Sequence, residues 1–152
     1  MRLNPGDVNV RKMTLSDLDS IVEIDEKVFG KKRPEYYQRK VEYALDSGNI
    51  VTSLVAEVDG RIEGFVMGNV FLGEFGIPED TATIDTIGVD PDFQRQGIAR
   101  VLVDQFVSNM RAIGVNRIHT LVEWNDGKLI MFFDALGFAP ARTLSLELRV
   151  LH

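Results

Sequence analysis

Residues 84–100 read Ile84-Asp85-Thr86-Ile87-Gly88-Val89-Asp90-Pro91-Asp92-Phe93-Gln94-Arg95-Gln96-Gly97-Ile98-Ala99-Arg100. A β-branched strand runs into a turn at Asp90-Pro91, and a polar loop then opens a long amphipathic helix. The loop has the form Gln-x-x-Gly-x-Ala and lies where a helix leaves its first backbone N–H groups without partners. Those donors and the positive end of the helix dipole favour phosphate oxygens. The stretch therefore predicts a cradle for a pyrophosphate.

The rest of the composition is that of an ordinary globular domain. The chain has 152 residues, of which 45% are hydrophobic, a net charge of −6 and no cysteine. This length favours one domain over residues 1–152, and the lack of a long basic run argues against a nucleic-acid partner. The missing cysteines exclude a disulfide, a cysteine metal site and an enzyme-bound thioester, and no clustered ligands suggest a metal. We expect a cytoplasmic protein with no membrane partner, because neither a signal peptide nor a spanning segment is recognisable.

Hydrophobic periodicity predicts the elements of the first half. Thr14 is a good N-cap for the first helix, and Asp17 completes a capping box. Pro34 suits the first turn of a second helix, and Asp59-Gly60 is a strong hairpin signal. The expected elements are a strand over Val8–Arg11, helices over 14–29 and 34–48, and strands over Ile50–Val58 and Arg61–Phe71.

The second half alternates strands and helices. After a loop over Gly73–Asp80, we expect strands over Thr81–Val89, Arg117–Trp124 and Thr143–Val150, with helices over Ile98–Ile113 and from Asn125 to Leu136. The order β-α-α-β-β-β-α-β-α-β describes a single α/β domain, with a mixed central sheet and helices on both faces. The apolar final strand is suited to pair with a second subunit, which leaves a homodimer open.

Two segments resemble the GNAT superfamily of acyl-CoA-dependent N-acyltransferases. Gln94 to Ala99 fits that family's Arg/Gln-x-x-Gly-x-Gly/Ala signature, and it follows Ile87-Gly88-Val89 and Asp90-Pro91 as the family pattern expects. Asn125 to Phe138 is similar to the family's closing helix and ends in Leu-Gly-Phe. The resemblance covers nearly the whole chain but is specific only in these segments. It implies a GNAT-type fold, closest to the branch that acetylates peptide N-termini or lysine side chains.

The resemblance also implies how acetyl-CoA, the acyl donor, is held. The amides from Gln94 to Ala99 bind its diphosphate, and Arg95 or Arg100 adds charge. The pantetheine arm bonds the backbone at Ile87 and Val89, beside a slot left where this strand diverges from the next. An oxyanion donor is expected among the same N–H groups, and Gly88 is compatible with a β-bulge there. The expected cofactor-binding residues are Ile87, Gly88, Val89, Gln94, Arg95, Gln96, Gly97, Ile98, Ala99, Arg100, Asn125 and Phe133.

The acid–base residues are less strongly indicated. Asp85 lies in an otherwise apolar strand, and Glu123 lies near the end of the neighbouring strand, so either can take a proton directly or through a water. A structural role for both, with water as the base, is the alternative. Many relatives carry Tyr where this chain has Phe133, which cannot protonate a thiolate but can pack on the pantetheine end. Asn125 or Asp126 either contacts the pantetheine arm or caps the last helix, and we favour Asn125 as the contact.

Together, these features and the resemblance predict the transfer of an acetyl group from acetyl-CoA to a primary amine. Direct attack in a ternary complex is expected, because no covalent nucleophile is evident. A peptide N-terminus or a lysine side chain is the favoured acceptor, and a small-molecule amine is the alternative among enzymes. A non-catalytic acyl-CoA-binding sensor, with Phe133 as its mark, is the alternative outside enzymes.

Overall fold

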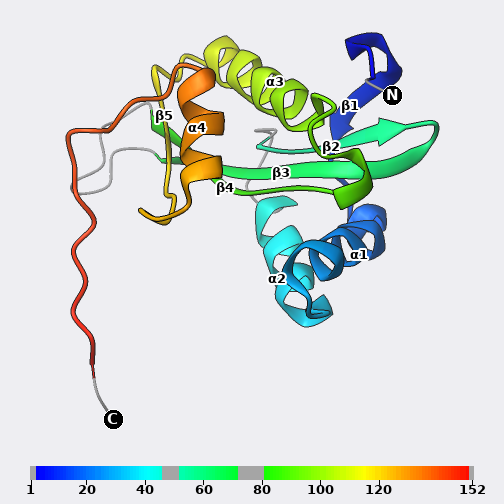
Figure 1. Cartoon of the computed structure of the whole chain (residues 1–152), viewed down its shortest axis with the longest axis horizontal. Coiled ribbons are helices and arrows are strands. Elements are labelled where there is room, and N and C mark those ends of the chain that lie inside the picture. Colours follow the sequence, from blue (N-terminus) through cyan, green and yellow to red (C-terminus); the bar gives the residue numbers. More distant parts are fainter. Residues whose placement is uncertain (1–2, 46–51, 72–80, 151–152) are drawn as a thin grey trace. The chain divides into compact units, whose positions relative to one another are not determined.

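Five strands in the order β1-β2-β3-β4-β5 form a mixed sheet in the first of two units of the chain, residues 1–120 and 121–152 (Figure 1). The structure is a computed structural model that describes residues 3–45, 52–71 and 81–150. The first four strands pair antiparallel and β4 pairs parallel with β5, which confirms the predicted mixed sheet. The strands are β1 (Val8–Lys12), β2 (Ser53–Val58), β3 (Arg61–Phe71), β4 (Thr81–Val89) and β5 (Arg117–Thr120).

The four α-helices of the described residues lie within the stretches predicted for them, with bounds that differ by a few residues. The first unit holds α1 (Leu18–Phe29), α2 (Pro34–Leu45) and α3 (Ile98–Ala112), and the second holds α4 (Gly127–Ala135). Asp17 Oδ2 accepts from the Thr14 N–H at 2.8 Å, as in the predicted capping box, and a short 3-10 turn then leads into α1. Gly30 ends α1 at φ +89°. The predicted end of the second helix at Gly48 and the loop over Gly73–Asp80 lie outside the described residues.

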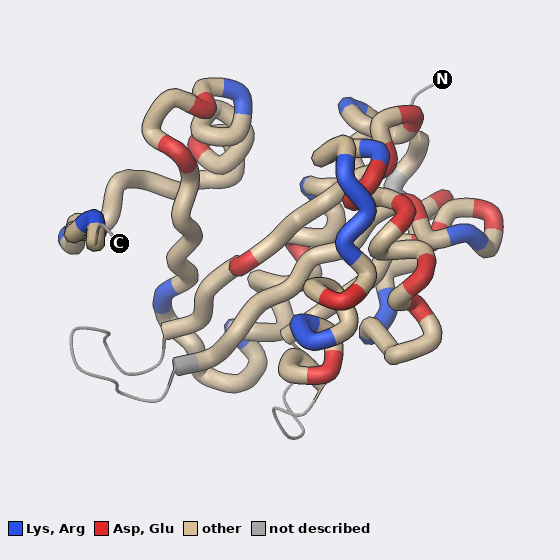
Figure 2. The backbone as a smooth tube through the Cα atoms, turned by 90° about the horizontal axis from the view of Figure 1, so that it is seen from below, with Lys and Arg blue, Asp and Glu red and all other residues tan. Residues whose placement is uncertain are grey.

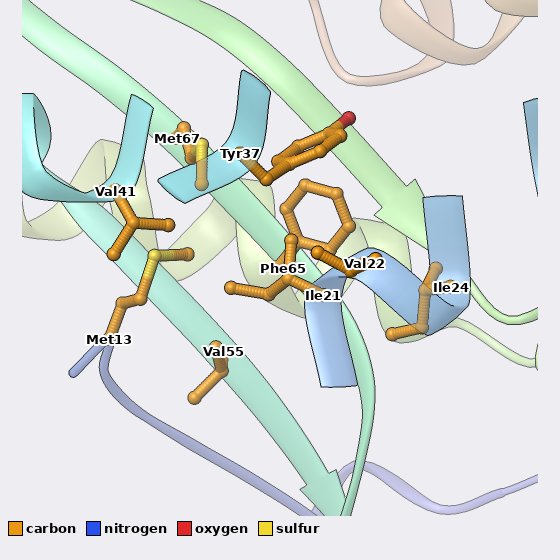
Figure 3. Packing of buried hydrophobic residues seen from close by; sticks show 9 residues of the cluster. All are labelled: Met13, Ile21, Val22, Ile24, Tyr37, Val41, Val55, Phe65 and Met67. Atoms are coloured by element: carbon orange, nitrogen blue, oxygen red, sulfur yellow. The ribbon is translucent and has the colours of Figure 1, made fainter. Parts of the chain in front are cut away.

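Helices cover both faces of the sheet, as predicted, and β3 shows how. Phe65 and Met67 point to one face, into a buried cluster with α1, α2 and β2 (Figure 3). Gly64 and Gly68 lie against α3 on the other face, where a Cβ on Gly68 would stand 2.4 Å from the Phe106 ring. Helix α3 therefore packs directly on the backbone of β3. The cluster consists of Met13, Ile21, Val22, Ile24, Tyr37, Val41, Val55, Phe65 and Met67.

The predicted final strand is wrong for this structure. Thr143–Val150 is assigned to no strand, and the side chains of Leu144, Leu146 and Leu148 are 85–90% exposed. Alternation identifies a segment suited to pairing, but a strand needs a neighbouring edge, and no described segment pairs with this one. For the same reason β5 ends at Thr120 and not at Trp124. Pairing of the segment with a second subunit stays a prediction.

Charges are mixed along the chain. Acidic and basic positions are interspersed along the traced backbone (Figure 2).

Within the described residues, no three His, Asp or Glu side chains are grouped so as to hold a metal ion, and none of the helices is long and apolar enough to cross a membrane. The expectations of no metal and no nucleic-acid partner stay predictions.

A partly buried ion pair joins α1 to the residue that precedes α2. Asp25 accepts from Arg33 through both carboxylate oxygens, at 2.6 and 2.9 Å, and from the Tyr37 hydroxyl at 3.0 Å. The Arg33 guanidinium also lies 4.0 Å from the centre of the Phe29 ring. Burial alone would raise the pKa of Asp25, but the bonds from Arg33 and Tyr37 outweigh it and hold this pKa below the usual value.

We expect Asp25→Asn to lower the free energy of unfolding by about 2 kcal/mol at pH 7, because charge-assisted hydrogen bonds of this kind contribute about that much. A depressed folded-state pKa stabilises fully above the unfolded carboxyl pKa of about 4 and is lost as pH falls through the folded value. The gap between wild type and variant should therefore shrink below about pH 4. Urea unfolding at pH 7, 4 and 3 measures it, with exposed Glu26→Gln on the same helix as control. A gap that stays constant over this range contradicts the assignment.

Candidate functional site

Strand β4 loses its neighbour on one edge halfway along its length. β5 pairs with it only from Thr81 to Ile84, and the ladder ends where Thr120 Oγ1 donates to the Ile84 carbonyl at 3.0 Å. Beyond that point, no described strand pairs with this edge of β4 up to Val89. The expected divergence of the two strands is thus present. It leaves backbone groups of β4 available to a ligand.

A β-bulge lies where the strands part, but at Asp85 and not at Gly88. On β3, Met67 pairs with Thr86 and Gly68 pairs with Ile84, so Asp85 is the extra residue of β4. Gly88 has a regular partner in Phe65, and a Cβ on Gly88 would stand 2.7 Å from that ring. The glycine therefore makes room for a core aromatic residue. The bulge leaves Asp85 without a pairing partner on β3.

The loop between β4 and α3 is held by its own side chains. Asp90 Oδ1 accepts from the Asp92 N–H at 2.9 Å and so caps the 3-10 turn Pro91–Phe93. Gln94 Nε2 donates to the Val89 carbonyl at 3.2 Å, and Gln96 Nε2 donates to the Asp92 carbonyl at 3.1 Å. The two glutamine side chains thus stabilise the conformation of the loop.

The backbone of the loop has the form expected of an anion site. Arg95 and Gly97 have φ values of +65° and +92°, and Gly97 is the N-cap of α3. Left-handed residues of this kind turn neighbouring N–H groups toward one side, and the first turn of α3 adds donors without intrahelical acceptors. Apart from neighbouring residues of the chain, no atom lies within 4 Å of a Cβ built on Gly97, so the space at that position is open. We call residues 94–99 the cradle.

Two buried carboxylates and an exposed lysine form a charge cluster at the start of the loop that leads to the cradle. Asp90 is buried, its Oδ2 lies 2.8 Å from Lys27 Nζ on α1, and its N–H donates to the Glu63 carbonyl. Burial raises the pKa of Asp90, but Lys27 and the Asp92 amide outweigh it and hold this pKa below the usual value. The buried Glu63 carboxyl has a raised pKa because of burial and the charge of Asp90. Sequence reasoning missed Lys27 and Glu63, since no local pattern marks a partner on a distant element.

Asp85, a predicted base, is bound by a lysine from α2. Lys40 Nζ lies 2.6 Å from Asp85 Oδ2 and donates to the Tyr36 hydroxyl at 3.4 Å. Burial lowers the pKa of Lys40, but Asp85 and Tyr36 outweigh it and raise this pKa above its ordinary value. Lys40 had no signal in the sequence. Glu123 is exposed in the second unit, beyond the end of β5. The catalytic roles of both carboxylates stay predictions.

Asp126, and not Asn125, caps the helix of the second unit. Asp126 Oδ1 accepts from the Leu129 N–H at 3.2 Å and is the N-cap of α4, whereas Asn125 is exposed. Phe133 is 5% exposed and its ring packs edge-on against Phe132 and Phe138, at centroid distances of 5.1 and 5.0 Å. It therefore has a packing role within this unit, and its contact with a cofactor stays a prediction.

Fold and site define an α/β protein with an anion cradle at the head of a helix and an open strand edge beside it. Residues 18–138 match the model of the acetyltransferase (GNAT) family, and the chain belongs to that family. The [ribosomal protein bS18]-alanine N-acetyltransferase of Salmonella typhimurium is 30% identical over 96 residues, which cover 63% of this chain and 60% of that protein. The chain thus spans about three fifths of the length of this curated relative.

Two solved structures share the fold. The ribosomal-protein-S18-alanine N-acetyltransferase from Escherichia coli superposes with a TM-score of 0.71 at 24% identity, covering 88% of this chain and 79% of the other. The aminoglycoside N-acetyltransferase AAC(6')-Iy in complex with CoA has a TM-score of 0.78 at 17% identity, covering 93% and 94%. Both likenesses support the fold assignment and leave the acceptor open.

The two ends of α3 provide a matched test of the cradle. Gly97 and Gly114 have φ values of +92° and +87°, and both have open space at the Cβ position. Alanine at either position should lower the free energy of unfolding by about 1 kcal/mol, because a Cβ is strained on a backbone with positive φ. Only Gly97→Ala should weaken acetyl-CoA binding in calorimetric titration, by fivefold or more (about 1 kcal/mol). Equal affinity of the two variants would remove Gly97 from the cofactor site.

Proposed function

We propose that the chain transfers an acetyl group from acetyl-CoA to a primary amine by direct attack in a ternary complex. One observation carries the proposal: the open edge of β4 is followed, after the short turn Pro91–Phe93, by the cradle at the start of α3, so one ligand can follow both. Membership of the acetyltransferase family supports the same reaction. A cytoplasmic location is part of the proposal.

The residues present fit acetyl-CoA. The cradle amides would hold the diphosphate, and the open space in front of Gly97 admits close approach. Arg95 in the loop and Arg100 in the first turn of α3 are both exposed and would add positive charge. The backbone at Ile87 and Val89 would bond the pantetheine amides as an added strand does. When bound, the thioester supplies an activated acyl carbon and a thiolate leaving group.

The reaction needs a base more than an acid. The amine nitrogen forms a bond to the acyl carbon, the carbon–sulfur bond breaks, and the amine proton passes to Asp85, to Glu123 or to water. An N–H among residues 87–89 would donate to the carbonyl oxygen as it gains charge. Phe133 has no proton to give, so the sulfur departs as the thiolate. Phe133 and Asn125 would contact the pantetheine arm.

The acceptor we propose is a peptide N-terminus or a lysine side chain. The relatives with bS18-alanine specificity support a protein acceptor. A small-molecule amine is the second candidate, because an aminoglycoside N-acetyltransferase shares the fold.

A thiol-release assay with acetyl-CoA tests the reaction. The panel has three acceptors. The first is a peptide with a free N-terminal alanine, the second is an N-acetylated version of that peptide with one lysine as its only primary amine, and the third is an aminoglycoside. We expect release with at least one peptide, at a higher kcat/KM than with the aminoglycoside. Calorimetric binding of acetyl-CoA without release by any acceptor would instead favour a sensor, and no binding at all would overturn the proposal.

Asp85→Asn should lower kcat by about a hundredfold, because a positioned general base contributes at least that much. Glu123→Gln is the matched carboxylate-to-amide change at the second candidate. The variant that removes the true base should also lose the acidic limb of the pH–rate profile. Unchanged profiles in both variants would assign the proton to water or to another group.

A further inference from the structure

Lys40, Asp85 and Tyr36 form a cation site in which the cation is supplied by the chain itself. Lys40 Nζ lies 2.6 Å from Asp85 Oδ2, donates to the Tyr36 hydroxyl at 3.4 Å and lies 5.4 Å from the centre of the Tyr36 ring. The Lys40 side chain is only 18% exposed. A carboxylate, a phenol oxygen and an aromatic ring recognise any primary ammonium group. None of these contacts requires that the ammonium belong to Lys40.

The site lies at the head of the open edge of β4. Asp85 is the bulge residue, and it directly follows Ile84, where pairing with β5 ends. It is two residues from Ile87, whose backbone the proposed function assigns to the pantetheine arm. Tyr36 and Lys40 stand one turn apart on α2, and Lys40 reaches Asp85 from that helix while contacting Tyr36. An ammonium held here is therefore close to the reacting end of that arm.

Exchange of one ammonium for another needs no movement of the core. The side chain of Asp85 is 45% exposed, and Tyr36 is exposed to the same extent. Lys40 stands at the end of a flexible four-carbon stem and can turn outward into water. Two ammonium groups within reach of one carboxylate repel each other, so an incoming amine and Lys40 compete for Asp85.

We propose that Asp85 and Tyr36 form the ammonium subsite of the acceptor and that Lys40 fills this subsite in the free protein as an internal competitor. The ligand class is a primary ammonium, as on a peptide N-terminus or a lysine side chain. The inference rests on the proposed function, because it places the acceptor of that reaction. Its consequence is that the apparent affinity for the acceptor is reduced by the fraction of time that Lys40 leaves the subsite open.

Lys40→Met tests the competition, because methionine keeps much of the apolar stem and removes the ammonium. If Lys40 fills the subsite nine-tenths of the time, the KM of the peptide with a free N-terminal alanine falls about tenfold. The KM of acetyl-CoA stays as in wild type. Arg39→Met is the matched control: Arg39 is the exposed neighbour on α2, and its loss removes the same charge without opening the subsite. This control should leave the KM of the peptide unchanged.

Two further arms separate competition from a structural role. An alkoxyamine acceptor, uncharged at neutral pH, should show the same KM in wild type and Lys40→Met. In an Asp85→Asn background, Lys40→Met should no longer lower the KM of the peptide. A KM that rises or stays constant in Lys40→Met overturns the proposal, as does a fall of equal size in Arg39→Met. Lys40→Gln repeats the measurement if the methionine variant is poorly folded.

A binding measurement makes failure of this inference distinct from failure of the proposed function. Propylammonium chloride, which matches the outer part of a lysine side chain, is titrated into wild type and Lys40→Met and followed by calorimetry. Binding about tenfold tighter to Lys40→Met supports the subsite even when no acceptor releases thiol from acetyl-CoA. Equal affinity overturns the subsite even when the acetyl transfer is observed.

Discussion

The parting of β5 from β4 after Ile84 is the constraint on which the candidate site depends. On its other edge β4 pairs with β3 from Thr81 to Val89 apart from the bulge at Asp85, which keeps β4 in the sheet beyond the end of β5. Residues 85–89 then present one edge without a strand partner among the described residues, although a central strand normally satisfies its backbone on both sides. A ligand that carries amide groups meets that need, and the carboxyl end of a strand at such a break in the sheet is where α/β proteins bind ligands.

Packing of α3 on β3 brings the cradle to the same place. Gly64 and Gly68 let the helix approach the strand backbone, with Ile98 and Phe106 filling the space that side chains would occupy. The first turn of α3 is thereby fixed at the end of β4. The loop between them contains a non-glycine residue, Arg95, at positive φ and a buried carboxylate, Asp90. Such local strain persists only where the surroundings hold it, here through Lys27 and the bonds within the loop.

Local sequence signals predicted most of the fold, but they did not predict the contacts between residues far apart in the sequence. Asp59 and Gly60 adopt φ values of 52° and 80°, as the dipeptide predicts for a tight hairpin. Lys27 and Asp90 are 63 positions apart in the sequence, and the residues next to each of them give no indication that the two interact. The bulge at Asp85 likewise depends on the register of β3. Thr143–Val150 shows the converse error, because its alternation reports a suitable side-chain pattern and says nothing about whether a partner edge is present.

The protonation chemistry of the proposed reaction favours one acceptor over the other. A thiolate whose conjugate acid has a pKa of about 8.5 leaves readily without a proton donor, so a phenyl ring at position 133 costs little. The amine, in contrast, must lose its proton before attack. An α-amino group, with a pKa of about 8, is neutral a few hundred times more often at pH 7 than a lysine with a pKa of about 10.4. An ammonium bound against Asp85 is stabilised in its charged form, as the raised pKa of Lys40 illustrates. The more acidic amine overcomes this stabilisation more easily, which supports the proposal of a peptide N-terminus as the acceptor.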